Sequence, residues 1–321
     1  MSADLSSAAS APRGVLLVRL CNWVGEVVLS LPALRRLAAA GYQLHLYGKG
    51  WAPILLEGAG WPVTVRRGDL RQTTAQLRTL RRTIDSRTAP ALLFTNSFES
   101  ALETRLAGFA PSGFAREGRS ILLRHAYPMP SFDPAAHSYW HLAGEFLGTQ
   151  EAFPASLGPS WTPSDDQRTR AQSLAAQHGL AAGTFVVLCP FSGPDDRNNL
   201  RVWPGFRELA AALHDLKVPV VLCPGPGEEL GAQVIAPNAL QLPGIDLGVY
   251  GALLQLSRSV VANSTGPGHL AAAAGALLVS LYGPHSVAAW RPIGPHVHLF
   301  QDYSGWPSVD RVAEVVLATN D

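Results

Sequence analysis

Residues 263–275 read N-S-T-G-P-G-H-L-A-A-A-A-G, and this stretch indicates the fold more directly than any other part of the chain. An apolar run at residues 259–262 precedes it and is typical of a buried strand, while the alanines that follow favour a helix. Free N–H groups and the positive end of the helix dipole meet where a strand turns directly into a helix, so the junction is suited to bind a phosphate or diphosphate. An ordinary N-capped core helix explains the same spacing equally well.

Five residues of this junction are candidate contacts for a phosphorylated ligand. Gly266 and Gly268 would let the ligand approach the backbone, because glycine carries no side chain. Ser264 and Thr265 offer hydroxyl groups, and His269 in the first helical turn can donate to a phosphate oxygen. Under the alternative interpretation, Ser264 or Thr265 caps the helix and the alanines serve close packing.

Short apolar runs alternate with helical patterns along the whole chain, which predicts α/β units built on parallel sheets. We expect strands at residues 14–20, 42–47, 63–66, 91–95, 184–189, 218–223, 239–242, 259–262 and 277–282. We expect helices at residues 25–40, 51–58, 70–87, 137–147, 165–178, 204–216, 227–234, 248–257, 267–275 and 308–318, and another that begins near residue 96. Residues 116–134 show no clear pattern and are expected to be irregular.

Chain length and proline content predict two domains. The 321 residues exceed what one ordinary core accommodates. Residues 148–165 lack periodicity and contain three prolines, so they are the best candidate linker. We therefore expect a disordered tail at residues 1–13, a first domain at 14–155 and a second at 156–321. Ligands of open α/β sheets bind at the carboxyl ends of the strands, which predicts a site in a cleft between the two domains.

The composition argues against several classes of protein. A net charge of +1 gives no case for a nucleic-acid partner, and no apolar run reaches the roughly 18 to 20 residues that span a bilayer. The first 13 residues lack the apolar segment of a signal peptide, so we expect a cytoplasmic protein with three reduced cysteines. The sequence contains none of four common motifs of metal and nucleotide sites, namely H-E-x-x-H, D-x-D, G-x-G-x-x-G and the P-loop. We therefore expect no cofactor and no strict metal requirement, with assistance by Mg²⁺ left open.

The junction after the first predicted strand reads L-C-N-W-V-G-E at residues 20–26 and places Glu26 at the start of a helix. The helix dipole keeps a carboxylate in this position ionised, as a general base must be. It also lowers the basicity, so partial burial would be needed to raise the pKa again. An acidic residue that merely complements the helix dipole is the commoner explanation of such a pattern.

Two loops of the second half carry further candidate ligand contacts. Residues 190–204 read P-F-S-G-P-D-D-R-N-N-L-R-V-W-P, with Ser192 and Gly193 directly after a strand and Arg201 before a helix that Pro204 begins. Arg201 could neutralise a diphosphate or be a surface charge. Residues 224–229 read P-G-P-G-E-E, where Glu228 could bind a ribose diol.

Several of these motifs, in this order, resemble the ADP-heptose:lipopolysaccharide heptosyltransferases, which form glycosyltransferase family nine and have the GT-B fold. The resemblance covers residues 14–318. It rests on N-W-V-G-E at 22–26, N-S-F-E-S-A at 96–101, L-A-G-F at 106–109, G-R-S-I-L-L at 118–123, R-V-W-P at 201–204 and N-S-T-G-P-G-H-L-A-A-A at 263–273. It implies two Rossmann-like, doubly wound domains that face each other across a cleft.

The resemblance also implies an activity, namely the inverting transfer of a sugar from a nucleotide diphosphate to a saccharide or lipid-linked glycan acceptor. Heptose from ADP-heptose is the implied donor, and Glu26 is the implied base. The residues implied to bind the donor are Ser192, Gly193, Arg201, Glu228, Ile245, Ser264, Thr265, Gly266, Gly268 and His269. The residues implied to bind the acceptor, in the first domain, are Asn22, Trp23, Gly25, Asn96, Ser97 and Arg119.

Three positions depart from the family pattern. Glu26 stands where Asp is usual, Arg201 where Lys is frequent, and Ser264 where many members have Asp. A different sugar, or a nucleotide-sugar-binding protein with impaired catalysis, therefore stays an alternative, and an NAD-dependent epimerase is disfavoured. The basic helix expected at residues 70–87 would face either an anionic acceptor and the inner face of the bacterial inner membrane, or solvent alone.

Overall fold

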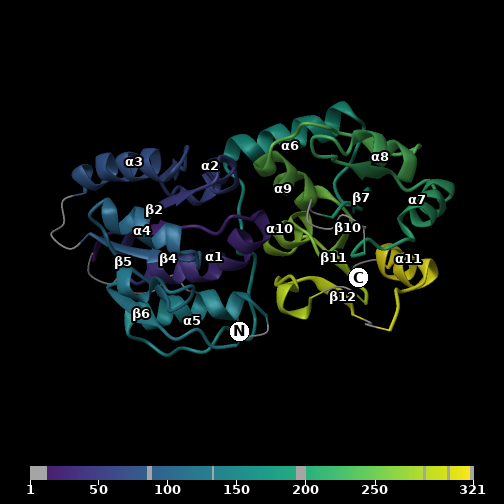
Figure 1. Ribbon diagram of the computed structural model, residues 1–321. Helices are drawn as coiled ribbons and strands as arrows, with labels where there is room; N and C mark the ends of the chain where they lie inside the picture. Colours follow the sequence, from purple (N-terminus) through teal and green to yellow (C-terminus); the bar gives the residue numbers. More distant parts are fainter. Residues whose placement is uncertain are drawn as a thin grey trace. The chain divides into compact units, whose positions relative to one another are not determined.

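The computed structural model describes residues 13–84, 89–131, 134–192, 200–284, 287–301 and 304–318. The chain divides into two compact units (Figure 1). Unit 1 comprises Met1–Leu56 and Gly60–Ala155, and unit 2 comprises Glu57–Ala59 and Ser156–Asp321. Most of the expected tail, residues 1–12, lies outside the described residues. Its last residue, Arg13, donates its backbone N–H to the carbonyl oxygen of Gly41 at 3.0 Å.

Unit 1 is built on one sheet of six parallel strands in the order β3-β2-β1-β4-β5-β6. The strands are β1 (Gly14–Arg19), β2 (Tyr42–Gly48), β3 (Val63–Val65), β4 (Pro90–Leu93), β5 (Ala110–Phe114) and β6 (His125–Tyr127). Helices α1 (Val24–Ala39) and α5 (Ala136–Leu147) pack together on one face, and α3 (Leu70–Thr83) and α4 (Phe98–Leu106) pack together on the other (Figure 1). The unit also contains α2 (Ala52–Leu55) and the 3₁₀ turn η2 (Arg119–Leu122), while η1 (Glu57–Ala59) groups with unit 2.

Unit 2 repeats this plan with the strand order β12-β11-β10-β7-β8-β9, again all parallel. The strands are β7 (Val186–Cys189), β8 (Val220–Leu222), β9 (Leu240–Gln241), β10 (Ser259–Asn263), β11 (Leu278–Tyr282) and β12 (Val297–Gln301). One layer of helices contains α6 (Asp165–Gln177), α9 (Leu247–Leu256) and α10 (Gly266–Ala274). The other contains α7 (Phe206–Asp215), α8 (Glu229–Ile235) and α11 (Val309–Leu317), and the turn η3 (Ala288–Trp290) precedes β12.

Both sheets share one topology, because in each unit the first strand lies beside the second on one side and beside the fourth on the other. This is the doubly wound order, whose ligands bind where the strand order reverses, at the carboxyl ends of the first and fourth strands. The reversal falls between β1 and β4 in unit 1 and between β7 and β10 in unit 2. The predicted fold class, two Rossmann-like α/β units, is confirmed.

Three strands escaped the sequence prediction. β5 reads A-P-S-G-F, and Pro and Gly are depleted in strands because they weaken the ladder. β6 has only three residues and lies within the stretch expected to be irregular. β12 is an edge strand, and the residues that precede it are rich in proline. By contrast, the central strands are continuous apolar runs buried on both faces, as parallel strands covered by helices must be, and these were predicted. The basic helix predicted to residue 87 ends at Thr83, and residues 85–88 lie outside the described part.

Candidate active site

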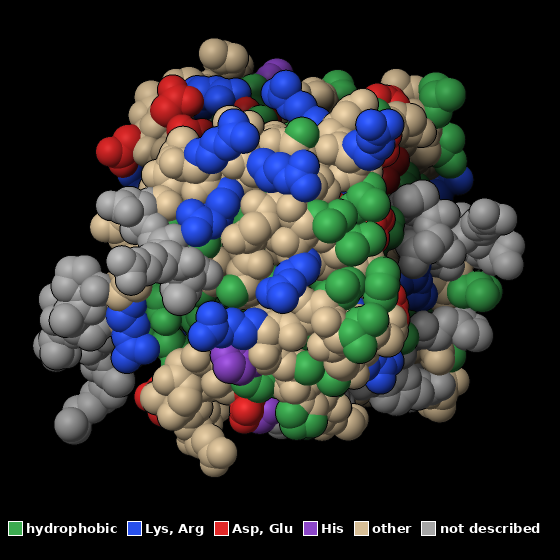
Figure 2. Space-filling model, turned by 60° about the vertical axis from the view of Figure 1, so that its left-hand side comes forward, with side chains coloured by type: hydrophobic (Ala, Val, Ile, Leu, Met, Phe, Trp, Pro, Cys, Tyr) green, Lys and Arg blue, Asp and Glu red, His purple; other side chains and the backbone are tan. Residues whose placement is uncertain are grey.

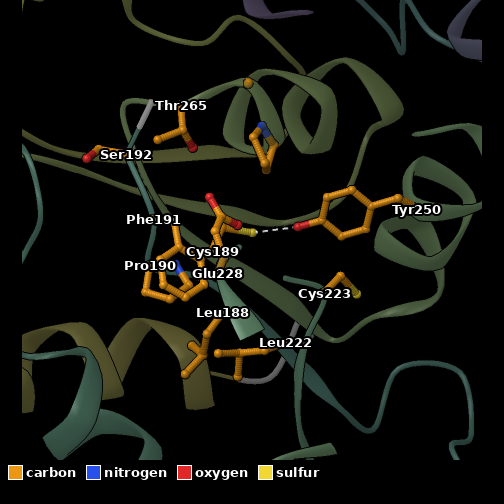
Figure 3. Close-up of a pocket in the computed structure, with 12 residues that line it drawn as sticks. Leu188, Cys189, Pro190, Phe191, Ser192, Leu222, Cys223, Glu228, Tyr250 and Thr265 are labelled. Atoms are coloured by element: carbon orange, nitrogen blue, oxygen red, sulfur yellow. Dashed lines mark hydrogen bonds between the residues drawn. The ribbon is translucent and has the colours of Figure 1, made fainter. Parts of the chain in front are cut away.

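A pocket opens in unit 2 at the carboxyl ends of β7 and β10, the place where the strand order reverses (Figure 3). It encloses about 170 Å³. The loops after β7 and β10 form one side, and the end of β8 with α9 forms the other. The lining residues are Leu188, Cys189, Pro190, Phe191, Ser192, Leu222, Cys223, Glu228, Tyr250, Thr265, Gly266 and Pro267. Four of the predicted donor-binding residues, Ser192, Glu228, Thr265 and Gly266, therefore meet in one pocket.

Three polar side chains of this pocket, Cys189, Tyr250 and Glu228, have defined contacts. The Cys189 thiol lies 3.0 Å from the Tyr250 hydroxyl, a contact drawn as a dashed line in Figure 3. Burial raises the pKa of Cys189 to about 12, so the thiol stays protonated near neutral pH. Glu228 supplies the acidic group of the pocket, and its Oε2 accepts the backbone N–H of Gly225 at 2.8 Å. Such a carboxylate can accept further hydrogen bonds from a diol.

Asn263 connects the loops around the pocket, a role that the sequence analysis did not assign to it. The residue ends β10 and is completely buried. Its Oδ1 accepts the backbone N–H of Trp203 at 3.0 Å, and its Nδ2 donates to the carbonyl oxygen of Pro190 at 2.9 Å. Trp203 is itself fully buried, and its indole Nε1 donates to the carbonyl oxygen of Pro307 at 2.9 Å. One side-chain amide at the end of β10 thus joins the segment that follows β7 to the segment that precedes α7.

The start of α10 has backbone N–H groups but no side-chain cap. Thr265 occupies the N-cap position, and its hydroxyl lies 3.4 Å from the carbonyl oxygen of Asn263 without bonding an N–H of the helix. Ser264 donates instead to the Tyr282 hydroxyl at 2.8 Å. Thr265 is thus the N-cap residue that the alternative interpretation allowed, but neither its side chain nor that of Ser264 caps the helix by a hydrogen bond. The N–H groups at this end are left for another acceptor, as an anion site requires.

Gly268 and His269 lie behind the pocket and not in its lining. A Cβ atom on Gly268 would come within 3.2 Å of the Ala262 side chain, so glycine lets α10 pack closely on β10. His269 is 6% exposed, and burial lowers the pKa of its ring to about 4. The ring is therefore neutral at physiological pH, and it lies in the core instead of reaching out as a surface cation would.

Two other predicted donor-binding residues, Arg201 and Ile245, lie elsewhere. Arg201 is half-buried in the turn before α7 and does not line the pocket. Ile245 lines a separate open hollow beside α6, together with the ion pair between Arg170 and Asp246, whose Nη2 and Oδ2 atoms are 2.6 Å apart. Gly193 lies outside the described residues.

In unit 1 the equivalent reversal point carries Glu26. The residue is half-buried in the first turn of α1, directly after the central strand β1. Burial raises the pKa of its carboxyl, while hydrogen bonds from the backbone of Trp23 and Asn22 lower it, and burial has the larger effect. The partial burial that the sequence argument required is therefore present. A carboxyl with a raised pKa is a better proton acceptor than an exposed glutamate.

Two groups near Glu26, the Cys21 thiol and the Tyr139 hydroxyl, are uncharged. Cys21 is buried, and its thiol donates to the Tyr139 hydroxyl of α5 at 3.2 Å. Burial raises the pKa of both groups above their ordinary values, and the Glu26 carboxylate raises each of them further. Both therefore stay neutral at physiological pH, so neither one stabilises the ionised Glu26 by charge.

The predicted acceptor-binding residues divide into exposed and structural ones. Asn22 is exposed and Trp23 is 58% exposed beside Glu26, whereas Gly25 is buried inside α1. On the neighbouring loop after β4, Asn96 is half-buried. Ser97 is the N-cap of α4, with its hydroxyl accepting the N–H of Ser100 at 3.3 Å.

Arg119 is not available to a ligand, because its side chain is completely buried. Its Nε donates to the carbonyl oxygen of Phe114 at 2.9 Å, Nη1 donates to the carbonyl oxygen of Thr95, and Nη2 donates to Asn96 Oδ1 at 3.3 Å. Burial lowers the pKa of the guanidinium to about 10, so it remains charged at physiological pH. The expectation of direct acceptor binding by Arg119 is therefore wrong, and the residue instead fixes the loop that presents Asn96.

Within the described residues, no group of three or more His, Cys, Asp or Glu side chains is placed to hold a metal ion. Among the described helices, none combines the length and the apolar character needed to cross a bilayer.

Comparisons with known proteins agree with this architecture. The profile of glycosyltransferase family 9 (heptosyltransferase) matches residues 77–316. The ADP-heptose lps heptosyltransferase II of E. coli is a similar solved structure, with a TM-score of 0.77, 24% identity and coverage of 94% of this chain and 97% of that chain. E. coli heptosyltransferase WaaC with ADP has a TM-score of 0.73 and 21% identity, and the match covers 94% of this chain and 98% of that chain. The family 9 glycosyl transferase of Veillonella parvula DSM 2008 has a TM-score of 0.76 and 18% identity, and the match covers 92% of this chain and 89% of that chain. No curated protein sequence matches the chain.

Proposed function

The chain belongs to glycosyltransferase family 9, and from that premise we propose that it transfers heptose from ADP-heptose, with inversion, to a saccharide acceptor in lipopolysaccharide core or related glycan assembly. The family makes the chain a glycosyltransferase. The observation that carries the mechanism is the half-buried Glu26 carboxyl, whose pKa is raised, at the reversal point of the unit 1 sheet.

Glu26 is the general base of this proposal. The acceptor hydroxyl oxygen attacks the anomeric carbon, the bond from that carbon to the diphosphate breaks, and the hydroxyl proton passes to the Glu26 carboxylate. One displacement of this kind inverts the anomeric configuration and needs a single base. General-base catalysis typically contributes about 10²- to 10⁴-fold, and it is most effective when the pKa of the base lies near the working pH. The raised pKa of Glu26 moves it in that direction.

Unit 2 holds the donor in this proposal. The pocket beside Cys189 and Tyr250 receives the nucleoside, and the Glu228 carboxylate accepts hydrogen bonds from the ribose hydroxyls. The uncapped start of α10 faces the diphosphate with its backbone N–H groups and dipole. Arg201 neutralises the leaving diphosphate from the segment before α7. E. coli heptosyltransferase WaaC has been solved with ADP, which supports the same nucleotide here.

One observation favours a sugar other than heptose as the second candidate. Ser264 stands where the family often has Asp, and its hydroxyl is engaged by Tyr282, whose own hydroxyl donates to the carbonyl oxygen of Trp290 at 2.6 Å. A serine held in this way offers the donor sugar no carboxylate.

The acceptor is proposed to be anionic and to lie at the inner face of the bacterial inner membrane, where the enzyme works from the cytoplasm as a peripheral protein. Lys and Arg side chains, drawn in blue, are spread over the surface shown in Figure 2. On and beside α3, four arginines are exposed, namely Arg67, Arg71, Arg78 and Arg82. Each basic residue near an anionic membrane contributes about 1 kcal/mol of attraction. A helix face that contacts only solvent does not require such a concentration of positive charge.

Replacing Glu26 tests the mechanism. Glu26→Ala should lower the rate of ADP release from ADP-heptose by at least about 100-fold with a panel of heptose-deficient core saccharides, because it removes the base. Binding of ADP, measured by calorimetry, should be unchanged. Glu208 occupies the same third position in α7, is exposed, and provides the matched control Glu208→Ala. A Glu26→Ala enzyme that keeps full turnover would refute the mechanism, and ADP binding without turnover in the unaltered protein would favour a binding protein.

A further inference from the structure

Arg19 is a buried arginine at the end of β1. Its side chain is about 5% exposed and reaches in two directions. On one side its Nε lies 3.7 Å from Oε1 of Glu103, a carboxylate of α4 that is 1% exposed. On the other side its Nη2 donates to Asn22 Oδ1 at 2.9 Å. The guanidinium therefore connects the Glu103 carboxylate of α4 to the loop that follows β1.

The Glu103 carboxylate is held by a second arginine as well. Glu103 Oε2 also accepts Arg66 Nη2 at 3.1 Å, and the same Nη2 lies 2.7 Å from Glu99 Oε1. Arg19 itself lies over the Tyr47 ring, 5.3 Å from the centroid. A buried ion pair of this kind is rarely more stabilising than well-packed apolar side chains, because two charges lose their hydration. Stability alone therefore does not explain why a guanidinium is placed here.

The loop at the other end leads to the base. Asn22 is otherwise exposed, and the next residue, Trp23, is the N-cap of α1 but gives it no side-chain hydrogen bond. Glu26 is the third residue of α1, the position from which a glutamate side chain turns back to the N-cap backbone in a capping box. The backbone N–H groups of Trp23 and Asn22 are the groups that hydrogen-bond its carboxylate.

We propose that Arg19 is a positioning residue for the base: through its bond to Asn22 it holds the loop at residues 20–23 so that the backbone N–H groups of Asn22 and Trp23 face the Glu26 carboxylate. This role rests on the proposed function only in calling Glu26 the base, because the positioning itself exists without substrate. Two neighbours of Glu26, Cys21 from the strand end and Tyr139 from α5, are both neutral. Burial has the largest effect on the pKa of the Glu26 carboxyl, and these two backbone groups are what lowers it.

A titration of Glu26 without substrate tests the proposal. The full chain, labelled with ¹³C at glutamate carboxyls, is titrated by NMR, and the Glu26 signal is assigned by its loss in Glu26→Gln. Asn22→Ala should raise the Glu26 pKa by about one unit, because a weakened hydrogen bond to a carboxylate favours its protonated form. Arg19→Met should produce a similar shift, and the double variant should add little to either, since both changes break the same connection.

The controls keep a general loss of structure apart from the proposed effect. Arg36 is another buried arginine of unit 1, and its Nη1 and Nη2 donate to Trp140 O at 3.0 Å and Thr149 Oγ1 at 2.8 Å, so Arg36→Met should leave the Glu26 titration unchanged. Should Arg19→Met fail to fold, Asn22→Ala decides alone, because its side chain is at the surface. An unshifted Glu26 in Asn22→Ala would overturn the positioning role. Failure of the proposed function would appear separately, as undiminished transfer by Glu26→Gln.

Discussion

Replacing Asn263 by alanine should loosen the pocket of unit 2 more than any exposed substitution. The change removes both bonds of a completely buried amide, so the N–H of Trp203 and the carbonyl oxygen of Pro190 lose their partners inside the protein. Each buried polar group left unpaired costs roughly 1 to 3 kcal/mol, which gives an expected destabilisation of about 2 to 6 kcal/mol for the two groups together. The loops after β7 and β10 should also become mobile together, since this one side chain connects them.

Native-state hydrogen exchange followed by mass spectrometry measures both effects. Peptides from β7, β10 and the segment before α7 should exchange about 30- to 20,000-fold faster in Asn263→Ala, the equivalent of the expected free energy at a factor of ten per 1.4 kcal/mol. Affinity for ADP should fall as well, because the pocket is lined by the two loops. Asn238→Ala is the matched control, since Asn238 is exposed in the same unit. Exchange in β7 and β10 that stays within a factor of about three of the unaltered protein would refute this account of Asn263.

Three further predictions follow from buried groups. Gly251→Ala places a Cβ 2.6 Å from the Trp161 ring and should destabilise unit 2 by about 1 to 3 kcal/mol in thermal unfolding, whereas Gly50→Ala, with its nearest neighbour at 4.0 Å, should have little effect. Because burial raises the pKa of Glu26 above its unfolded value, the carboxyl favours folding below the unfolded pKa and loses that contribution as the pH rises through the folded pKa. Glu26→Gln should therefore gain stability relative to the unaltered protein between pH 4 and pH 8, and a constant difference in urea unfolding over that range would contradict it. ADP should slow alkylation of Cys189 and Cys223, which line the pocket, but not of Cys21 in unit 1; equal protection of all three would place the nucleotide elsewhere.

The sequence was sufficient to predict the α/β units, the central strands and the two helix starts that carry the site. Apolar runs of four or more residues mark strands buried on both faces, and such runs produced β1, β7, β10 and β11. The edge strands β6 and β12 are shorter or partly exposed, and β5 contains both Pro and Gly, so the local pattern gave no strand signal there. Their places depend on pairing with neighbours that a single sequence does not display.

The side-chain roles at the site were predictable only where they depend on local position. Glu26 was placed correctly at a helix start because the signal lies in adjacent residues. Arg119 was taken for a ligand contact, yet its partners at Thr95 and Asn96 are more than 20 residues away and bury it completely. Ser264 likewise bonds Tyr282, 18 residues along the chain, instead of capping its own helix.

The residues that sequence reasoning missed share one physical cause, which also explains why they are buried and polar. Where the strand order of a parallel sheet reverses, the loops after two neighbouring strands turn away to opposite faces, so their backbone groups leave the ladder without a partner in the next strand. A buried polar side chain can satisfy them, and unit 2 does this with Asn263, between Pro190 and Trp203. Unit 1 uses guanidinium groups, with Arg119 on the carbonyl oxygen of Thr95 and Arg19 on the carbonyl oxygen of Leu20. Each of these side chains holds a loop of the proposed site, so we expect changes to them to disturb the geometry of that loop together with the stability of the fold.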